Sequence, residues 1–467
     1  MKGHLYFIGI TGHAIRGLAL AARDNGYEVS GLDETGAPPG SDWLDERDIR
    51  WSRQFEPAQL HDVTAVIVTG AHVSDEYPAV VEARRRAIPI KSWAQWAGEF
   101  AADKRVLAVA GTHGKTTTTS LITWLLEAAG RRPDFLIGIK PFNFDSSVRL
   151  SDAPVLVIEG DEYRASNLEP QAKLEYYHPN VLVLTSVEHD HPDMYPDLQS
   201  VIDRFSSVVA ALSGDGRLVV WNGSETALQV AAKASCEVVT YGLKDGDYSA
   251  RDVGYLPAGL EFDVHHDGRL LGRLAVPMYG RHNVLNALAA TVVALGEGLT
   301  FAEIMAGAVG FKGAYRRFNV LTPAGAPITV IDDYAHHPTE VAATIEAVKL
   351  HFAGQRLLVV YRPHTYSRTK ALLAEYRASF GQADLVFMAD VEAARESAAD
   401  RTVSGADIVA GLGEQAVYEP DRARLADRVV AAARPGDVVL CMTVSGYDRI
   451  ANELAERLGA TTGEAAA

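Results

Sequence analysis

Short runs of Val, Ile and Leu alternate along the chain with stretches whose apolar residues recur at helical spacing. The first unit joins the run HLYFIGI, from position 4, through the helical stretch AIRGLALAARDNG to the run EVSGLD. Similar runs follow at intervals: AVIVTG, VLAVAG, VLVIEG, VLVLTS, ITVIDD, LLVVY and VVLCMTV. This alternation is typical of β-α-β units, whose strands form parallel sheets. The predicted fold class is α/β.

The pattern falls into three blocks, and 467 residues are too many for one ordinary hydrophobic core. We place the boundaries at 1–102, 103–316 and 317–467. A Rossmann-like sheet is expected in the first and third blocks. The middle block is expected to form a parallel sheet of the phosphate-loop ATPase type. Within it, residues 214–277 read as a β-rich insertion.

Composition narrows the functional classes. A net charge of −16 disfavours nucleic-acid binding, because the phosphate backbone would be repelled. The only cysteines, Cys236 and Cys441, cannot build a disulfide framework or a zinc site by themselves. The N-terminus lacks the long apolar core of a signal peptide, and no apolar run reaches the roughly 18 residues of a membrane span. We therefore expect a cytoplasmic enzyme that binds neither nucleic acid nor membrane.

A glycine-rich loop follows the run VLAVA and precedes a helical stretch. Its glycines permit a tight turn with inward-pointing amides, Lys115 supplies a cation, and the Thr116 hydroxyl can ligate magnesium. Only two residues separate its glycines where the usual loop has four, so it is a shortened variant. A purely structural turn is the alternative, but strand, loop and helix follow in the order that a nucleotide site needs. The residues expected to bind nucleotide are Gly111, Thr112, His113, Gly114, Lys115, Thr116 and Thr117.

Acidic residues follow two of the apolar runs. The carboxyl ends of parallel strands open on the same crevice as a phosphate loop. Either group alone could be a solvated turn, but two groups together with the loop favour a magnesium site. The candidates are Glu159, Asp161, Glu162, Glu188, Asp190 and His191.

The first block carries its own glycine pattern, GITGHAIRG, with Gly9, Gly12 and Gly17. Asp33 ends the second apolar run, which strengthens a dinucleotide-like interpretation. A structural turn between strand and helix is the alternative. Taken alone, this block would suggest an oxidoreductase, but GTHGKTT has no place in a simple dehydrogenase.

Several motifs together resemble the Mur ligase family over nearly the whole chain. They are GTHGKTT, IEGDEY, VEHDH, GRHNVLN, RRF and DDYAHHPTE, in that order and spacing. The closest branch joins L-alanine ligases with murein peptide ligases. The resemblance implies three domains and a reaction in which ATP phosphorylates the lactyl carboxylate of UDP-N-acetylmuramate. An amine then displaces the phosphate, as a step of peptidoglycan synthesis. A non-catalytic relative is disfavoured, because the residues for phosphoryl transfer are all present.

The resemblance also assigns roles to residues. Lys115, Arg317 and His191 would be catalytic, with Arg317 reaching the γ-phosphate from the third domain. Mg²⁺ or Mn²⁺ would be held by Thr116, Glu162 and His191. Further ATP contacts would be Asn286 at the adenine, with Asp333 and His336 at the ribose and phosphate edge. The first domain would hold the UDP-sugar through Gly9, Gly12, Gly17 and Asp33.

The acceptor amine is less clearly marked. The first two blocks look closer to peptide ligases, for example in DEYRASN, whereas YRPHTYSRT in the third block is similar to alanine ligases. The third domain holds the acceptor in this family, so we predict L-alanine, bound by His364, Tyr366 and Arg368. The alternative is the tripeptide L-Ala-γ-D-Glu-meso-diaminopimelate, since Thr365 replaces an arginine of the alanine-ligase pattern. We expect a monomer or a homodimer.

Overall fold

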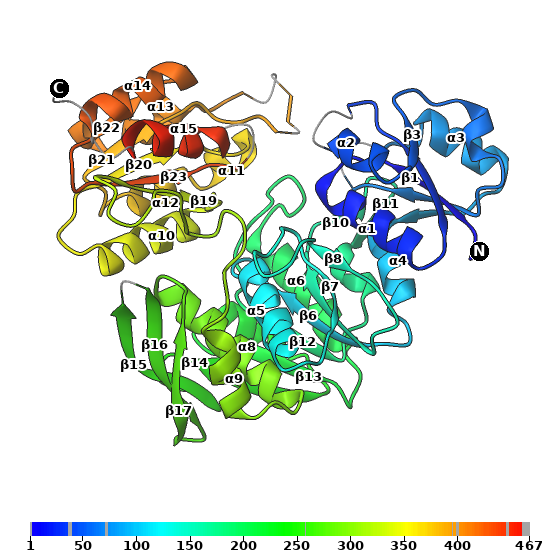
Figure 1. Ribbon diagram of the computed structural model, residues 1–467, viewed down its shortest axis with the longest axis horizontal. Helices are drawn as coiled ribbons and strands as arrows, with labels where there is room; N and C mark the ends of the chain where they lie inside the picture. The colour runs from blue at the N-terminus through cyan, green and yellow to red at the C-terminus, as the bar shows by residue number, and fades with distance from the viewer. Residues whose placement is uncertain are drawn as a thin grey trace.

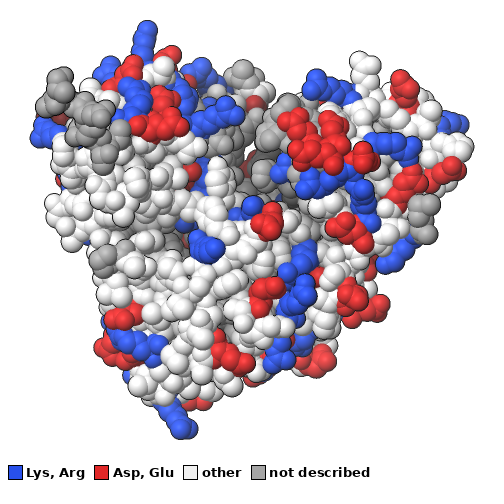
Figure 2. Space-filling model, viewed as in Figure 1, with Lys and Arg blue, Asp and Glu red and all other residues white. Residues whose placement is uncertain are grey.

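Three sheets organise the computed structural model, which describes residues 2–35, 40–70, 73–256, 258–394, 396–397, 401–444 and 448–459. The central domain lies below the other two, which stand apart on either side of its upper face (Figure 1). Acidic and basic side chains are interspersed over the face drawn in Figure 2, which is hollowed between the N-terminal and C-terminal domains. Within the described ranges every helix is too short or too polar to span a bilayer. The predicted α/β class with three domains is confirmed.

The N-terminal sheet has the order β3-β2-β1-β4-β5, and all its strands are parallel. Its central strand β1 is buried throughout, as expected for a continuous apolar run covered on both faces. The elements are β1 (His4–Ile8), α1 (His13–Asp24), β2 (Glu28–Leu32), α2 (Gly40–Asp45), β3 (Arg50–Ser52), η1 (Pro57–Leu60), β4 (Ala65–Val68), α3 (Pro78–Arg85), β5 (Ile90–Ser92) and α4 (Trp93–Phe100).

The central sheet has ten strands in the order β17-β16-β15-β14-β13-β12-β6-β9-β7-β8. A separate hairpin joins β10 to β11. The elements are β6 (Arg105–Ala110), α5 (Lys115–Ala128), β7 (Asp134–Leu136), β8 (Val148–Arg149), β9 (Val155–Gly160), β10 (Arg164–Ser166), β11 (Glu169–Ala172), η2 (Lys173–Tyr176), β12 (Val181–Leu184), α6 (Leu198–Ala210), β13 (Arg217–Trp221), α7 (Glu225–Ala231), β14 (Glu237–Gly242), β15 (Tyr248–Leu256), β16 (Gly259–His266), β17 (Arg269–Val276), α8 (Arg281–Gly296) and α9 (Phe301–Ala308).

The β-rich segment at 214–277 is continuous with this central sheet. Strands β13 and β14 pair in parallel with their neighbours, because helix α7 carries the chain back between them. Within this segment β15, β16 and β17 form the antiparallel part, and they extend the sheet at one edge. Helices α5 and α8 pack together on the sheet, so the start of α8 lies close to the loop that precedes α5.

The C-terminal sheet has the order β18-β19-β23-β20-β21-β22, with only the edge strand β18 antiparallel. The strands of the three sheets lie within residues 4–92, 105–276 and 319–442. We therefore propose domain boundaries at 102/103 and 316/317. The elements are β18 (Asn319–Val320), β19 (Thr329–Asp333), α10 (Pro338–His351), β20 (Leu357–Tyr361), α11 (Tyr366–Ala371), α12 (Leu373–Ser379), β21 (Leu385–Met388), α13 (Gly405–Val409), η4 (Gly413–Gln415), β22 (Ala416–Tyr418), α14 (Arg422–Ala432), β23 (Val438–Met442) and α15 (Asp448–Leu458).

Candidate active site

A cavity of about 480 Å³ lies between the central and C-terminal domains. Its walls come from the loop before α5, the ends of β9 and β12, the start of α8, and the segments that follow β19 and β20. Most of the residues singled out in the sequence as ATP, metal or acceptor ligands line it. They are Thr112, His113, Gly114, Lys115, Thr116, Thr117, His191, Asn286, Arg317, Asp333, His336, His364 and Arg368.

The loop before α5 needs both of its glycines. Gly111 has φ +120° and Gly114 has φ +78°, a region that side chains rarely adopt. A Cβ atom at Gly111 would lie 2.3 Å from Oγ1 of Thr185, and one at Gly114 would lie 2.4 Å from Oδ1 of Asn286. Asn286 of α8 therefore touches the phosphate loop, which places the expected adenine contact at the edge of that loop.

The ammonium of Lys115 is folded back over the loop. It donates to the carbonyl oxygens of Gly111 (2.6 Å) and Thr112 (3.2 Å) and to Oε2 of Glu162 at 2.9 Å. Burial alone would lower the pKa of Lys115, but Glu162 and Asp161 raise it above its usual value. The lysine is therefore charged, and one of its partners is a carboxylate that the resemblance assigns to the metal.

Three side chains at the ends of β9 and β12 form a group suited to a cation. Ligand atoms of Asp161, Glu162 and His191 all lie within 4.8 Å of one another. Asp161 also pairs with Lys173; burial alone would raise its pKa, but that lysine holds it below the usual range. The hydroxyl of Thr116, the third expected ligand, donates to Oε1 of Glu159 at 2.9 Å. The structure thus brings the expected ligands Glu162 and His191 together and adds Asp161.

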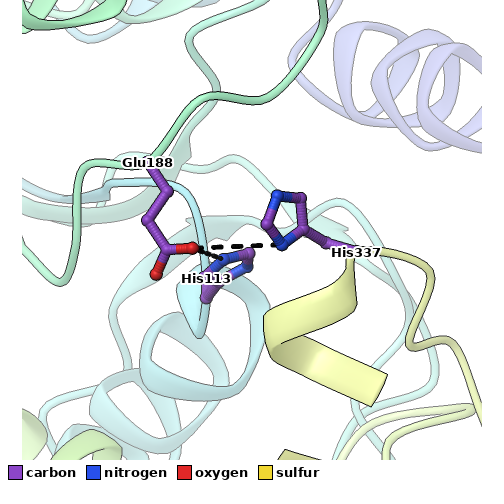
Figure 3. Close-up of side chains that lie close together, drawn as sticks. All are labelled: His113, Glu188 and His337. Carbon is purple, nitrogen blue, oxygen red and sulfur yellow. Dashed lines mark ion pairs between the residues drawn. The ribbon is translucent and has the colours of Figure 1, made fainter. Parts of the chain in front are cut away.

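A second polar group links the phosphate loop to the C-terminal domain (Figure 3). Nε2 of His113 lies 3.3 Å from Glu188, its Nδ1 lies 3.2 Å from Glu340 on α10, and His337 approaches Glu188 to 4.0 Å. Burial alone would lower the pKa of His113, but Glu188 and Glu340 raise it to about 10. His113 is consequently a cation held between carboxylates of two domains.

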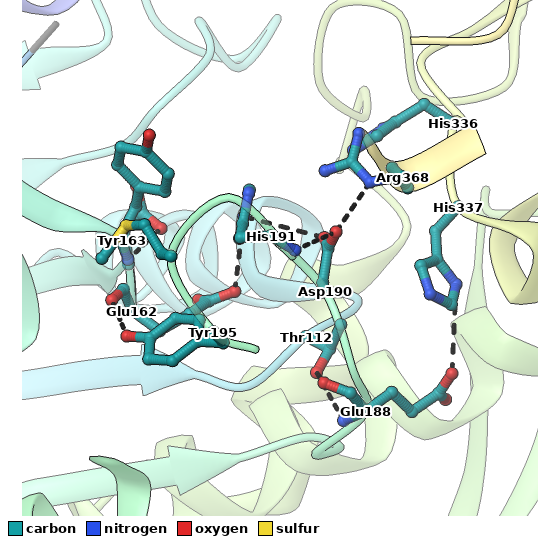
Figure 4. A network of polar contacts seen from close by, with 12 residues as sticks. Thr112, Glu162, Tyr163, Glu188, Asp190, His191, Tyr195, His336, His337 and Arg368 are labelled. Atoms are coloured by element: carbon teal, nitrogen blue, oxygen red, sulfur yellow. Dashed lines mark hydrogen bonds and ion pairs between the residues drawn. The ribbon is translucent and has the colours of Figure 1, made fainter. Parts of the chain in front are cut away.

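Arg368 makes a buried contact between the two domains (Figure 4). Its Nε donates to Oδ1 of Asp190 at 2.7 Å, and its Nη1 lies 3.2 Å from Nδ1 of His364. Burial alone would lower the pKa of Arg368, but Asp190 raises it above its usual value. Two of its five N–H groups are therefore engaged, so a two-pronged grip on an acceptor carboxylate would use the second hydrogen of Nη1 and those of Nη2, or displace one of these contacts.

Tyr366 lies away from the cavity wall. Its ring is buried in a small cluster with Val391 and Val403. Residues two apart on a helix do not face the same side, and Arg368 takes the side that faces the cavity. The expectation that Tyr366 contacts the acceptor is therefore not supported by its position.

The γ-phosphate and ribose candidates come from the start of the C-terminal domain. Arg317 stacks over Tyr334, 5.2 Å from the ring centre, and its buried Nε has no hydrogen-bond partner among the described residues. Asp333 accepts from the backbone N–H groups of Phe318 and Ala335, both at 2.7 Å, while burial raises its pKa. Arg317 thus has unused donor capacity, whereas Asp333 is occupied in shaping the turn.

The glycine motif of the N-terminal domain divides into two parts. Gly9 has φ +80° and Gly12 precedes α1, while Asp33 accepts from the N–H groups of Thr11 and Thr35, both at 3.1 Å. Asp33 therefore organises the two loops that border the start of α1.

Gly17 has a different position from the other two glycines. It is buried where α1 meets β8 of the central domain, and a Cβ there would lie 2.7 Å from Cγ2 of Val148. This position fits domain packing rather than the nucleotide contact expected from the sequence.

Two contacts of this site were not predicted from the sequence. Asp190 was one of six candidates for a magnesium site, but its partner Arg368 lies 178 residues away. Glu340 is the last residue of DDYAHHPTE, and it binds His113 as well as the N–H groups of His336 and His337. Glu340 stands three residues after His337, the N-cap of α10, which is the position of the acidic residue in a capping box. This spacing could have marked Glu340 in the sequence.

Comparison with known proteins gives matches along the chain. Residues 4–105 match the model described as Mur ligase family, catalytic domain. Residues 109–294 match the Mur ligase middle domain, and residues 316–443 match the Mur ligase, glutamate ligase domain. The UDP-N-acetylmuramate–L-alanine ligase of Rubrobacter xylanophilus is 34% identical over 98% of this chain and 100% of its own.

Two further relatives cover the whole fold. The UDP-N-acetylmuramate–L-alanyl-γ-D-glutamyl-meso-2,6-diaminoheptandioate ligase of Escherichia coli is 32% identical over 97% of this chain and 98% of its own. The crystal structure of a UDP-N-acetylmuramate–alanine ligase from Thermotoga maritima superposes with a TM-score of 0.80. It shares 24% identity and covers 98% of this chain and 99% of its own.

Proposed function

Because this chain belongs to the Mur ligase family, we propose that it joins the lactyl carboxylate of UDP-N-acetylmuramate to L-alanine at the expense of ATP. The observation that carries this proposal is the position of Lys115, a charged residue on a phosphate loop beside a carboxylate group. Phosphoryl transfer needs fixed cations more than a strong nucleophile. The product would be a peptidoglycan precursor.

Lys115 and Arg317 are the proposed stabilisers of the transferred phosphoryl group. Lys115 would exchange Glu162 for the β- and γ-phosphates, and Arg317 would approach from the C-terminal side of the cavity. Loop amides and the positive end of α5 add to the same field. Closure of the C-terminal domain would keep water from the acyl phosphate.

The proposed metal is Mg²⁺ or Mn²⁺. Glu162 and His191 would hold it, together with the hydroxyl of Thr116, which would have to leave its hydrogen bond to Glu159. Asp161 lies with Glu162 and His191, so the group offers carboxylate oxygens, which these hard cations prefer. The imidazole is a less usual ligand for Mg²⁺ and a better one for Mn²⁺. The metal would supply positive charge that neutralises the phosphate oxygens.

The acceptor is proposed to be free L-alanine, since His364 and Arg368 keep the alanine-ligase pattern and line the cavity. A murein peptide ligase is the second candidate, favoured by the 32% identity to the tripeptide ligase of Escherichia coli. A small acceptor needs a tight pocket and a tripeptide an open channel, so one activity should dominate. We further propose that the protein works in the cytoplasm, as a monomer or a homodimer.

Phosphate release with UDP-N-acetylmuramate and ATP tests the proposal. The purified protein is assayed with L-alanine, with the tripeptide L-Ala-γ-D-Glu-meso-diaminopimelate, and with neither. We expect kcat/KM for L-alanine to exceed that for the tripeptide by at least about 100-fold, the scale on which a shaped pocket rejects a wrong substrate. A preference for the tripeptide would reassign the acceptor. No release with either acceptor would reject the ligase function.

A further inference from the structure

The ring of His336 lies on the acceptor side of the cavity. Its centre is 6.0 Å from that of His364, and Figure 4 shows it beside Arg368. The hydroxyls of Tyr361 and Tyr376 donate to its backbone carbonyl at 3.0 and 2.5 Å. The residue is therefore held firmly, with its imidazole at the cavity wall.

The contacts of His336 fix which ring nitrogen carries the hydrogen. Nδ1 lies 3.0 Å from the carbonyl oxygen of Tyr334 and 3.3 Å from Oε2 of Glu340. A carbonyl and an ionised carboxylate can only accept, so Nδ1 is the donor. Nε2 then holds a lone pair, and none of the described residues hydrogen-bonds to it.

The charge state agrees with this tautomer. Burial lowers the pKa of His336 to about 4, with Glu340 opposing the shift and Arg368 reinforcing it. The ring is therefore neutral at pH 7 with Nε2 unprotonated, and it is a weaker base than a free imidazole. Once a proton is taken up, Glu340 and Asp190 supply negative charge nearby.

The neighbouring His364 carries its ring hydrogen on the other nitrogen. Nη1 of Arg368 lies 3.2 Å from its Nδ1, and a guanidinium can only donate. Nδ1 of His364 is therefore the acceptor, and a neutral ring carries its hydrogen on Nε2. Of these two histidines, only His336 has an Nε2 able to receive a proton.

We propose that Nε2 of His336 is the general base that takes the proton from the acceptor amine. This inference rests on the proposed ligase function. The amine nitrogen forms a bond to the carbonyl carbon of the acyl phosphate, and the carbon–oxygen bond to phosphate breaks. Phosphate leaves with that electron pair. The ammonium of L-alanine loses two protons in forming the amide: one moves to Nε2 before attack, and the other leaves with the phosphate. A positioned base of this kind contributes about 10²- to 10⁴-fold.

Hydroxylamine separates this role from others, because it is largely neutral near pH 7 and attacks an acyl phosphate without a base. His336→Asn retains an amide donor near Nδ1 and removes Nε2. We expect it to lose about 10²- to 10⁴-fold in turnover with L-alanine. Hydroxamate formation from UDP-N-acetylmuramate, ATP and hydroxylamine should stay within about tenfold of the wild type. His336→Gln is a second variant, and His61→Asn, at an exposed site of the N-terminal domain, is the control.

The outcomes are distinct. Selective loss with L-alanine in folded His336 variants supports the base. Equal loss with both nucleophiles places His336 in ATP use or in the fold and overturns it, as does unchanged turnover with L-alanine. Absence of hydroxamate in the wild type rejects the proposed function itself, and with it this step.

Discussion

The guanidinium of Arg368 in the C-terminal domain and the carboxylate of Asp190 in the central domain form a buried ion pair, with Nε 2.7 Å from Oδ1. The two residues are 2% and 7% exposed. Burial alone would raise the pKa of Asp190, but Arg368 and His191 hold it well below its usual value. The pair therefore ties the acceptor segment directly to the residue that precedes the proposed metal ligand His191.

Removing the carboxylate should loosen this tie. Asp190→Asn leaves the buried guanidinium unpaired, a change that costs about 3–5 kcal/mol in proteins. We expect a lower melting temperature and a larger radius of gyration by solution scattering. Asp427→Asn, which breaks an exposed pair with Arg457, is the matched control and should change neither. A melting temperature equal to that of the wild type would show that the pair does not hold the domains.

The bridge made by His113 should weaken in alkali. The pKa of His113 is about 10 in the folded protein and 6.5 for an ordinary histidine, as in the unfolded chain. Because the folded value is raised, the added stability is complete below about pH 6.5 and is lost as pH rises through about 10. The difference in unfolding free energy between wild type and His113→Asn should therefore shrink from pH 7 to pH 10. A difference that stays constant with pH would contradict the charged state of His113.

Lys115 should be needed for catalysis rather than folding. Lys115 lies at the start of α5, where its ammonium can bind the phosphates of ATP. Replacing it removes one group that stabilises their charge. Lys115→Ala should lose at least about 100-fold in turnover while its circular dichroism stays unchanged. Lys349→Ala, which removes a surface partner of Asp384, serves as the control. Near-normal turnover of Lys115→Ala would sink the assignment.

Glu162 should set the metal requirement. Glu162→Gln removes a charged ligand and also a partner of Lys115, so the variant should need more Mg²⁺ and turn over more slowly. Titration of activity with Mg²⁺ and Mn²⁺ measures the effect, with Glu237→Gln at the exposed start of β14 as the control. An unchanged metal requirement together with an unchanged rate would argue against Glu162 as a ligand.

Local patterns in the sequence were enough to place the phosphate loop. A buried strand, two glycines with positive φ and a helix starting at Lys115 are all short-range features. The Asp161 and Glu162 group was likewise visible as a strand end. The α/β class followed from alternation alone. These features depend on neighbours along the chain, which a single sequence displays.

Contacts between distant segments were not accessible in the same way. Nothing local indicates that Arg368 would meet Asp190, or that Glu340 would reach His113 in another domain. The direction of Tyr366 required the exact start of α11, since a helix turns it away from Arg368. The packing role of Gly17 depended on a strand of another domain, which its own motif does not reveal.

Helix α1 joins the proposed sugar-nucleotide loop to the surface of the central domain. Its first turn borders the glycine loop at Gly9 and Gly12, and its flank rests on Val148 through Gly17. Gly17 lies five positions after Gly12, which corresponds to a helical rise of about 7.5 Å. A Cβ at position 17 would lie too close to Val148, so the packing of α1 on β8 would have to shift. A single missing Cβ thus helps set the separation between the proposed sugar-nucleotide site in one domain and the proposed ATP site in the next.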